Sequence, residues 1–284
     1  MIFLGASILS LPISSRSREF TPFIDALFTA TSASCVTGLI VYDTATHWSV
    51  FGKIIIIAMI QCGGLGVVTM LTVFTQVTGK KIGLRDRATL QSALSAPQIG
   101  GIIRLTSFIF KATIIIEMMG ALLMFPSFMK DFGITKGIYY SVFHSISAFC
   151  NAGFDLMGDV SKFSSLTKYQ SDIMINITIM LLILIGGLGF LIWKDIFDYR
   201  FDIKRYSTQT KIVLTMTSVL VLFPSILFFF TEFSGLDIKT RVLSSLFQAV
   251  TPRTAGFNTI DYTKFSDNGI AMTIILMLIG GGSG

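Results

Sequence analysis

Three short segments of this sequence share one arrangement of small, polar and glycine residues. They end on Gly38, Gly153 and Gly256, and each has Leu or Phe immediately after its glycine and an apolar residue ten positions before it. Glycine lets a backbone adopt conformations in which successive carbonyl groups point the same way. A ring of such carbonyls can replace the water shell of a monovalent cation. The recurring segments therefore predict a cation path lined by main-chain oxygens.

The carbonyl-bearing positions are the two residues before each glycine and the glycine itself. We expect the ion-binding positions to be Val36, Thr37, Gly38, Asn151, Ala152, Gly153, Thr254, Ala255 and Gly256. A helix that ends beside these residues would present the negative end of its dipole to the cation. Any one segment alone would more simply be a small-residue surface for close helix packing. The threefold recurrence favours the ion path.

Each segment is preceded by a short apolar stretch, predicted as a helix over Phe23–Ser34, Gly137–Phe149 or Lys239–Val250. At about 1.5 Å per residue, helices of roughly 12 residues reach only halfway across a bilayer. A chain that enters halfway must return to the same face. Irregular backbone at that depth is tolerated where it is buried in protein or lines a water-filled path. Each glycine turn is thus a candidate pore lining.

Composition places these elements in a membrane protein. Of the 284 residues, 52% are hydrophobic and 13% charged, against roughly a quarter charged in a soluble domain. Apolar runs long enough to cross a bilayer cover Val50–Val77, Ile102–Phe128, Ile173–Trp193 and Ile212–Phe230. Water-soluble, collagen-like, disulfide-scaffold and disordered chains are excluded by the same pattern.

The charged residues indicate how the chain is oriented. The net charge is +6, and basic residues gather in two loops between apolar runs. Lys/Arg-rich loops face the cytoplasm, so the loops around 78–104 and 194–211 are predicted to be cytoplasmic and the Asp-bearing loop at 155–172 outward. Basic residues spread between membrane segments do not form a nucleic-acid surface. We expect no nucleic-acid partner.

Glycine clusters follow each turn, at Gly63–Gly66, Gly186–Gly189 and Gly280–Gly284. The first two are equally well explained as helix-packing surfaces. The third cannot be a stable helix interior, because each glycine costs about 1 kcal/mol relative to alanine. The predicted organisation is repeat 1 over 1–77, a cytoplasmic loop over 78–101, repeat 2 over 102–193, a cytoplasmic loop over 194–211 and repeat 3 over 212–284.

The segments Thr31–Leu39, Ser145–Asp155 and Thr251–Asp261 resemble the membrane subunit of the Trk/Ktr/HKT superfamily of potassium transporters, nearest to the bacterial Ktr type. The resemblance implies an all-α, multi-pass protein of the bacterial plasma membrane. In it, tandem helix, pore loop, helix repeats surround a central cation pore, with one filter glycine per repeat. It implies potassium uptake, with sodium stimulation in several members. It also implies a gating loop in repeat 3, at Gly280, Gly281, Gly282, Ser283 and Gly284.

The resemblance also implies partners. The Ktr type forms homodimers in the lipid bilayer and docks on a cytosolic ring of nucleotide-binding, RCK-type regulatory subunits. The two basic loops are candidate contact surfaces for these regulatory subunits. Alternatively, their charge only sets the orientation of the chain in the membrane. The subunit needs no cofactor besides transported K⁺, and Na⁺ in some relatives. The sequence holds three of an expected four repeats and stops inside the last helix of repeat 3, so we expect the fragment alone not to conduct.

Other readings stay open. A secondary transporter also uses broken helices, but typically in inverted repeats, whereas these three segments share one topology. An intramembrane hydrolase would require Ser283 and His144 to meet. Glu117, inside an apolar run, is expected to pair with Lys111 or an arginine, and the alternative is direct contact with the ion. Arg253 is expected to pair with a carboxylate such as Asp261 or Asp43. Asp43, Asp155 and Asp261 follow the turns and would attract cations, or are ordinary loop residues.

Overall fold

The computed structural model describes residues 1–66, 69–70, 75, 83–93, 101–200 and 202–281. Gly282, Ser283 and Gly284 of the predicted gate lie outside these residues. Within the described ranges the chain is all-α, with one isolated bridge between Ser15 and Trp48 and no strand. The helices are α1 (Ile2–Ser10), α2 (Phe23–Ser34), α3 (Thr44–His47), α4 (Val50–Gly64), α6 (Leu84–Ala93), α7 (Ile102–Phe149), α8 (Ile173–Leu188), α9 (Phe190–Tyr199), α10 (Thr208–Thr231), α11 (Ile238–Val250) and α12 (Asp267–Ile279). Short 3-10 turns cover Pro12–Ser14 (η1), Met157–Asp159 (η2), Thr167–Tyr169 (η3), Ile203–Arg205 (η4) and Tyr262–Lys264 (η5).

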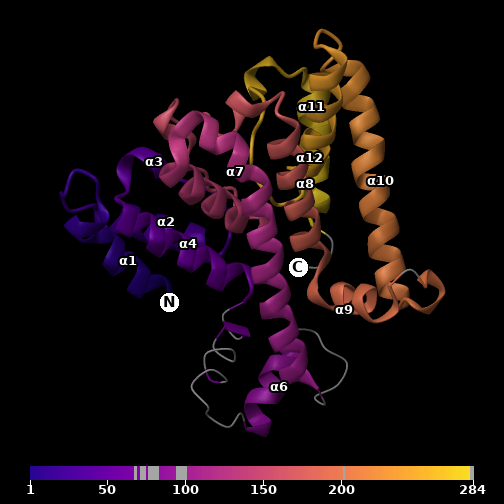
Figure 1. The fold of residues 1–284 in the computed structure, drawn as a ribbon, viewed down its shortest axis with the longest axis horizontal. Coiled ribbons are helices and arrows are strands. Elements are labelled where there is room, and N and C mark those ends of the chain that lie inside the picture. Colours follow the sequence, from indigo (N-terminus) through magenta and orange to yellow (C-terminus); the bar gives the residue numbers. More distant parts are fainter. Residues whose placement is uncertain (67–68, 71–74, 76–82, 94–100, 201, 282–284) are drawn as a thin grey trace.

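The longest element, α7, is two helices joined at a sharp bend. Its 48 residues include Gly133 at φ 76° and ψ 176°, a conformation open essentially to glycine alone. The limb before Gly133 is a long apolar span and the limb after it is a short helix that ends at Phe149. In Figure 1 the long limb rises from α6 through the centre of the molecule.

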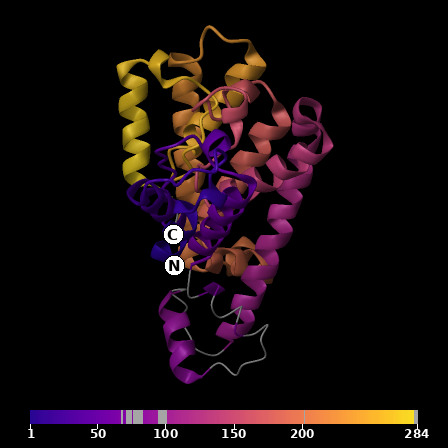
Figure 2. The same cartoon turned by 90° about the vertical axis from the view of Figure 1, so that its left-hand side faces the viewer.

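Two described helices, α7 and α10, are long and apolar enough to cross a membrane. The pair α8 and α9 makes a third crossing if its two bent parts count as one span. Figure 1 shows α10 at one edge of the molecule, next to α11 and α12, with α9 near its lower end, and Figure 2 gives the view turned by 90°. The prediction of an all-α membrane protein is confirmed.

Glycine clusters interrupt two of the long apolar runs, so these two runs are not continuous helices. The run Ile173–Trp193 bends by 98° at Gly189, between α8 and α9. In the run from Val50, α4 ends at Gly64. A Cβ at Gly63 would collide with the backbone oxygen of Ser34, and a Cβ at Gly186 with that of Phe149. The helix-packing reading therefore holds for these two glycines, because each lets a long helix touch the last residue of a short one.

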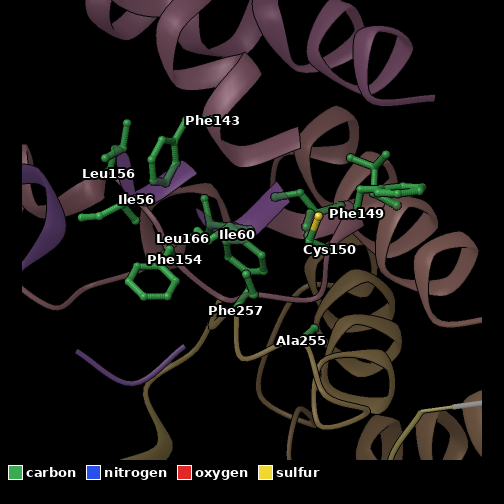
Figure 3. Close-up of a cluster of buried hydrophobic side chains, with 14 of the residues drawn as sticks. Ile56, Ile60, Phe143, Phe149, Cys150, Phe154, Leu156, Leu166, Ala255 and Phe257 are labelled. Carbon is green, nitrogen blue, oxygen red and sulfur yellow. The ribbon is translucent and has the colours of Figure 1, made fainter. Parts of the chain in front are cut away.

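A buried apolar core joins the three repeats. Phe143, Phe154 and Phe257 are at most 2% exposed and belong to one cluster, together with Ile56 and Ile60 of α4. Figure 3 shows these side chains between the ribbons of different segments. Fully burying such a side chain contributes about 1.5–3 kcal/mol. Phe154 and Phe257 directly follow two of the recurring glycines, so the core holds those turns in place.

Candidate ion-conducting site

The three glycine turns meet around one cavity of about 910 Å³. Its lining includes six of the predicted ion-binding residues, namely Val36, Thr37, Asn151, Thr254, Ala255 and Gly256. The helix-breaking clusters contribute Gly63, Gly64, Gly186, Gly187 and Gly281. Residues more than 200 positions apart thus line a single space.

The other three predicted residues form the contacts between successive turns. A Cβ at Gly38 would lie 2.6 Å from the carbonyl oxygen of Ala152, and a Cβ at Gly153 would lie 2.6 Å from that of Ala255. A Cβ at Gly256 would meet only the Cα of Gly153, at 3.6 Å. Each of the first two glycines therefore faces a carbonyl of the next turn, in the order first, second, third. Among the described residues, no carbonyl stands in that position against the third glycine.

The backbone conformation repeats in all three turns. Val36, Asn151 and Thr254, each two residues before the glycine, have φ of 56°, 54° and 72°. The glycines themselves have φ of 76°, 70° and 78°. Left-handed conformation is unusual for any residue with a side chain and a true outlier for β-branched ones such as Val36 and Thr254. It costs about 1–2 kcal/mol per residue, and strain of this kind gathers at functional sites.

Side-chain hydroxyls near the ends of the short helices hold two of the turns. Ser147 donates a hydrogen bond from Oγ to the carbonyl of Phe154 at 2.7 Å, and Thr251 donates from Oγ1 to that of Phe257 at 2.5 Å. In the first turn, Thr37 Oγ1 donates to Ser32 Oγ at 2.9 Å. Ser147 and Thr251 were not among the predicted site residues. Their sequence signal is a hydroxyl residue five or six positions before each glycine.

Arg253 connects the third turn with the start of the predicted gate. Only 6% exposed, it donates from Nε to the carbonyl of Gly280 at 3.3 Å and from Nη2 to Thr217 Oγ1 at 3.4 Å. The predicted pairing of Arg253 with a carboxylate is wrong, because its described partners are a carbonyl and a hydroxyl. Gly280 ends α12 with φ 70°, so the helix breaks where Arg253 holds it.

Glu117 lies behind the second turn. It is 8% exposed in α7, and its side chain is hydrogen-bonded to that of Gln61 while its Oε1 is buried without a partner. Within the described part of the chain, Glu117 forms no ion pair with Lys111 or an arginine, contrary to the prediction. Gln61 Oε1 also accepts a contact of 3.8 Å from Cys150 Sγ, next to Asn151. Glu117 is thus one contact removed from the turn and does not line the cavity.

The three outward carboxylates have different environments. Asp43 is 7% exposed and caps α3, accepting from the amides of Ala45 and Thr46; it also accepts from the amide of Phe163. Asp261 caps η5. Asp155, in the loop after the second turn, accepts from the amide of Met157 at 2.8 Å. Burial raises the pKa of Asp155 to about 6, although the Met157 amide opposes the shift.

His144 has both ring nitrogens occupied. Its Nε2 accepts from the amide of Leu156 at 3.3 Å, so Nδ1 carries the proton that is donated to the carbonyl of Tyr140 at 2.7 Å. The imidazole is fully buried. It is a core residue that fixes the loop after the second turn, and Ser283, its suggested partner, lies outside the described residues.

Comparison with known proteins agrees with this architecture. The chain is 42% identical, over its whole length, to the potassium/sodium uptake protein NtpJ of Enterococcus hirae. It is also 42% identical, over 99% of its length, to the Ktr system potassium uptake protein B of Bacillus subtilis. The chain spans 63% of the length of each of these relatives.

A solved structure shows the same fold. The potassium transporter TrkH of Vibrio parahaemolyticus superposes with a TM-score of 0.68 and 18% identity, covering 99% of this chain and 55% of that one. Residues 4–284 match the family described as TrkH, cation transport protein. The chain, an all-α integral membrane protein with three recurring glycine turns around one cavity, therefore belongs to the TrkH family of cation transport proteins.

Proposed function

We propose that this chain forms most of a potassium uptake path across the plasma membrane. The observation that carries the proposal is the left-handed pair of residues in each turn, at one cavity. A left-handed residue on either side of an ordinary one turns successive carbonyls toward the same side, as a carbonyl-lined filter requires. The nine predicted ion-binding residues of the three turns would then hold the dehydrated ion.

The arrangement of the turns supports a ring with one further member. The first and second glycines each face a carbonyl of the following turn, whereas the third faces none among the described residues. The names of the relatives supply the transported ions: potassium for one, potassium and sodium for the other. We propose K⁺ as the main cargo, with Na⁺ as a second or stimulating ion.

The break at Gly280 is the proposed gate. Gly281 lines the cavity below the third turn, and Arg253 ties Gly280 to that turn. A movement of this segment would open or close the path beneath the filter. The gating role of Gly282, Ser283 and Gly284 stays a prediction from the sequence.

The proposed assembly follows from the relatives. The Ktr system protein B is named as part of a system, which supports a cytosolic regulatory partner for this chain. The basic stretches 78–104 and 194–211 of the sequence are the docking surfaces that we propose on the predicted cytoplasmic side. A ring of RCK-type subunits and a homodimer of the membrane subunit are the forms we propose.

Growth on limiting potassium tests the function. Cells without their own uptake systems receive the full-length gene product with its regulatory subunit, the 284-residue segment alone, or neither. We expect rescue by the full-length product only. Absence of rescue, with the protein present in the membrane, would refute potassium uptake and favour a secondary transporter of another solute.

A further inference from the structure

A second cavity, of about 850 Å³, lies on the predicted outward side between repeats 1 and 2. It is formed by the η1 region and the loop after it, the start of α4, the short limb of α7 and η2. Figure 1 shows α1, α2, α3 and α4 gathered on one side of α7. We call this cavity the outer groove; its lining side chains include Arg16, Phe51, Lys53, Lys136 and Tyr139.

The outer groove carries an excess of positive charge. Its lining contains Arg16, Arg18, Lys53 and Lys136, and the carboxylate of Asp159 is the opposing charge among the lining residues. Asp159 approaches Arg16 at 3.4 Å and Lys136 at 3.9 Å, and both basic side chains are 64% exposed. Asp159 also accepts a hydrogen bond from Tyr140 at 2.7 Å. Asp159 is thus shared by Arg16 and Lys136, and Asp43 acts on Lys53 from outside the groove. The lining itself keeps a net positive charge.

Two buried polar groups in the groove point to a ligand rather than to solvent. Lys53 is 9% exposed and uses one donor, to the carbonyl of Ala45 at 2.6 Å. The hydroxyl of Tyr139 is buried and has no hydrogen-bond partner. A buried hydroxyl without a partner costs about 1–3 kcal/mol. A phosphate oxygen would satisfy it.

Apolar side chains continue from the groove into the depth of the membrane. On α4, Val50, Phe51 and Ile54 are exposed by 63%, 39% and 51%. Ile13 of η1, which also lines the groove, is 60% exposed. Val50 and Ile54 are four positions apart and share one face of α4. The start of α4 and η1 therefore offer exposed apolar side chains next to the basic groove.

The position of the charge is unusual for a membrane protein. Lys and Arg are concentrated in cytoplasmic loops, and extra positive charge outside a cation pathway works against cation entry. The groove lies between predicted repeats 1 and 2, whose turns contact each other through Gly38 and Ala152. It is thus not at the side of the ring where the third glycine lacks a neighbour.

We propose that the outer groove binds an anionic glycerophospholipid of the outer leaflet. Its phosphate meets Arg16, Lys136 and the Tyr139 hydroxyl, and its acyl chains lie along the exposed apolar side chains of α4 and η1. A bound lipid would join predicted repeat 1 to predicted repeat 2. This site is separate from the ion path and does not depend on the transported ion.

Lipid retention by the full-length protein tests the proposal. The protein is placed in nanodiscs of equal parts phosphatidylglycerol and phosphatidylcholine, and the lipids that stay bound are counted by native mass spectrometry. The groove variant is Arg16→Gln with Lys136→Gln. The matched control is Lys162→Gln with Lys239→Gln, which removes the same charge from exposed outward residues outside the groove.

We expect the wild type and the control to retain phosphatidylglycerol preferentially. The groove variant should lower that preference about thirtyfold, since it removes two basic residues and each one near an anionic lipid contributes on the order of 1 kcal/mol. Tyr139→Phe, which keeps the ring and all charges, should lower it by a smaller factor. Thermal unfolding in phosphatidylcholine alone checks that the variants are folded.

Four results would overturn the proposal. Equal retention of the two lipids by the wild type would show that the groove has no lipid preference. An equal loss of phosphatidylglycerol preference in the groove variant and the control would show that the groove residues are not the cause. Binding of inorganic phosphate in neutral nanodiscs, abolished in the groove variant, with no lipid preference, would assign the groove to a soluble anion. Loss of dimers without a change in lipid retention would make it a contact between two copies of the chain.

Discussion

Replacement of Gly38 by serine tests whether the carbonyl of Ala152, which Gly38 faces, belongs to the proposed filter. The new Cβ would lie 2.6 Å from the carbonyl oxygen of Ala152, about 0.8 Å inside the 3.4 Å at which ordinary contacts begin. The φ of 76° at Gly38 adds a backbone cost of about 1–2 kcal/mol for any residue other than glycine. The clash and the strain together must displace the first turn, the Ala152 carbonyl, or both.

The expected consequence is a change in ion selectivity. If Ala152 contributes a carbonyl to the ring, moving that oxygen by a large fraction of an ångström weakens its contact with K⁺. The contact with Na⁺, which is smaller and more strongly hydrated, is weakened less. A differential loss of 1.4 kcal/mol is a tenfold change in preference. We expect the ratio of K⁺ to Na⁺ uptake to fall by about tenfold in Gly38→Ser.

A matched variant separates strain from clash. Gly101, before α7, has φ of 82°, and a Cβ there would have no atom within 4 Å. Gly101→Ser therefore imposes a similar backbone cost without moving a filter carbonyl. Uptake of K⁺ and Na⁺ is measured for both variants in full-length protein at matched membrane levels. An unchanged ratio in Gly38→Ser, or an equal drop in both variants, would refute the assignment of this turn to the filter.

Three further predictions address the supports of the site. Arg253→Gln should weaken the hydrogen bond between residue 253 and the Gly280 carbonyl and so change the rate of K⁺ uptake at constant selectivity; Arg253→Lys is the comparison. An unaltered rate in both variants would contradict the proposed link to the gate. Ser147→Ala leaves the Phe154 carbonyl without its hydroxyl donor and should lower stability by about 1–3 kcal/mol in thermal unfolding, whereas Ser141→Ala, whose hydroxyl only bonds within its helix, should cost less; equal costs would show that the Ser147 bond has no special weight. Because burial raises the pKa of Asp155 to about 6, this carboxyl loses its charge as external pH falls below that value, so K⁺ uptake should decrease there; Asp155→Asn should show low uptake at neutral pH and no such decrease, and an identical pH profile would exclude Asp155 as the cause.

The sequence by itself determined the local elements. The helix predicted over Phe23–Ser34 has those bounds in the structure, and the one predicted from Lys239 begins one residue earlier, at Ile238. Helix formation in such stretches depends on apolar content and on residues that end the helix, and both are local properties. The three glycines were also recognisable, because their left-handed backbone needs a residue without a Cβ.

Only the tertiary structure decided which groups meet. Arg253 binds the carbonyl of Gly280 instead of a carboxylate, and Asp43 is used as a helix cap that also holds a distant loop. The bend at Gly189 and the close contact of Gly186 with Phe149 depend on where a second helix passes. Hydrogen-bond partners far apart in sequence are selected by packing, which no local pattern encodes. For the same reason, the basic groove between repeats 1 and 2 became visible only when its residues were brought together.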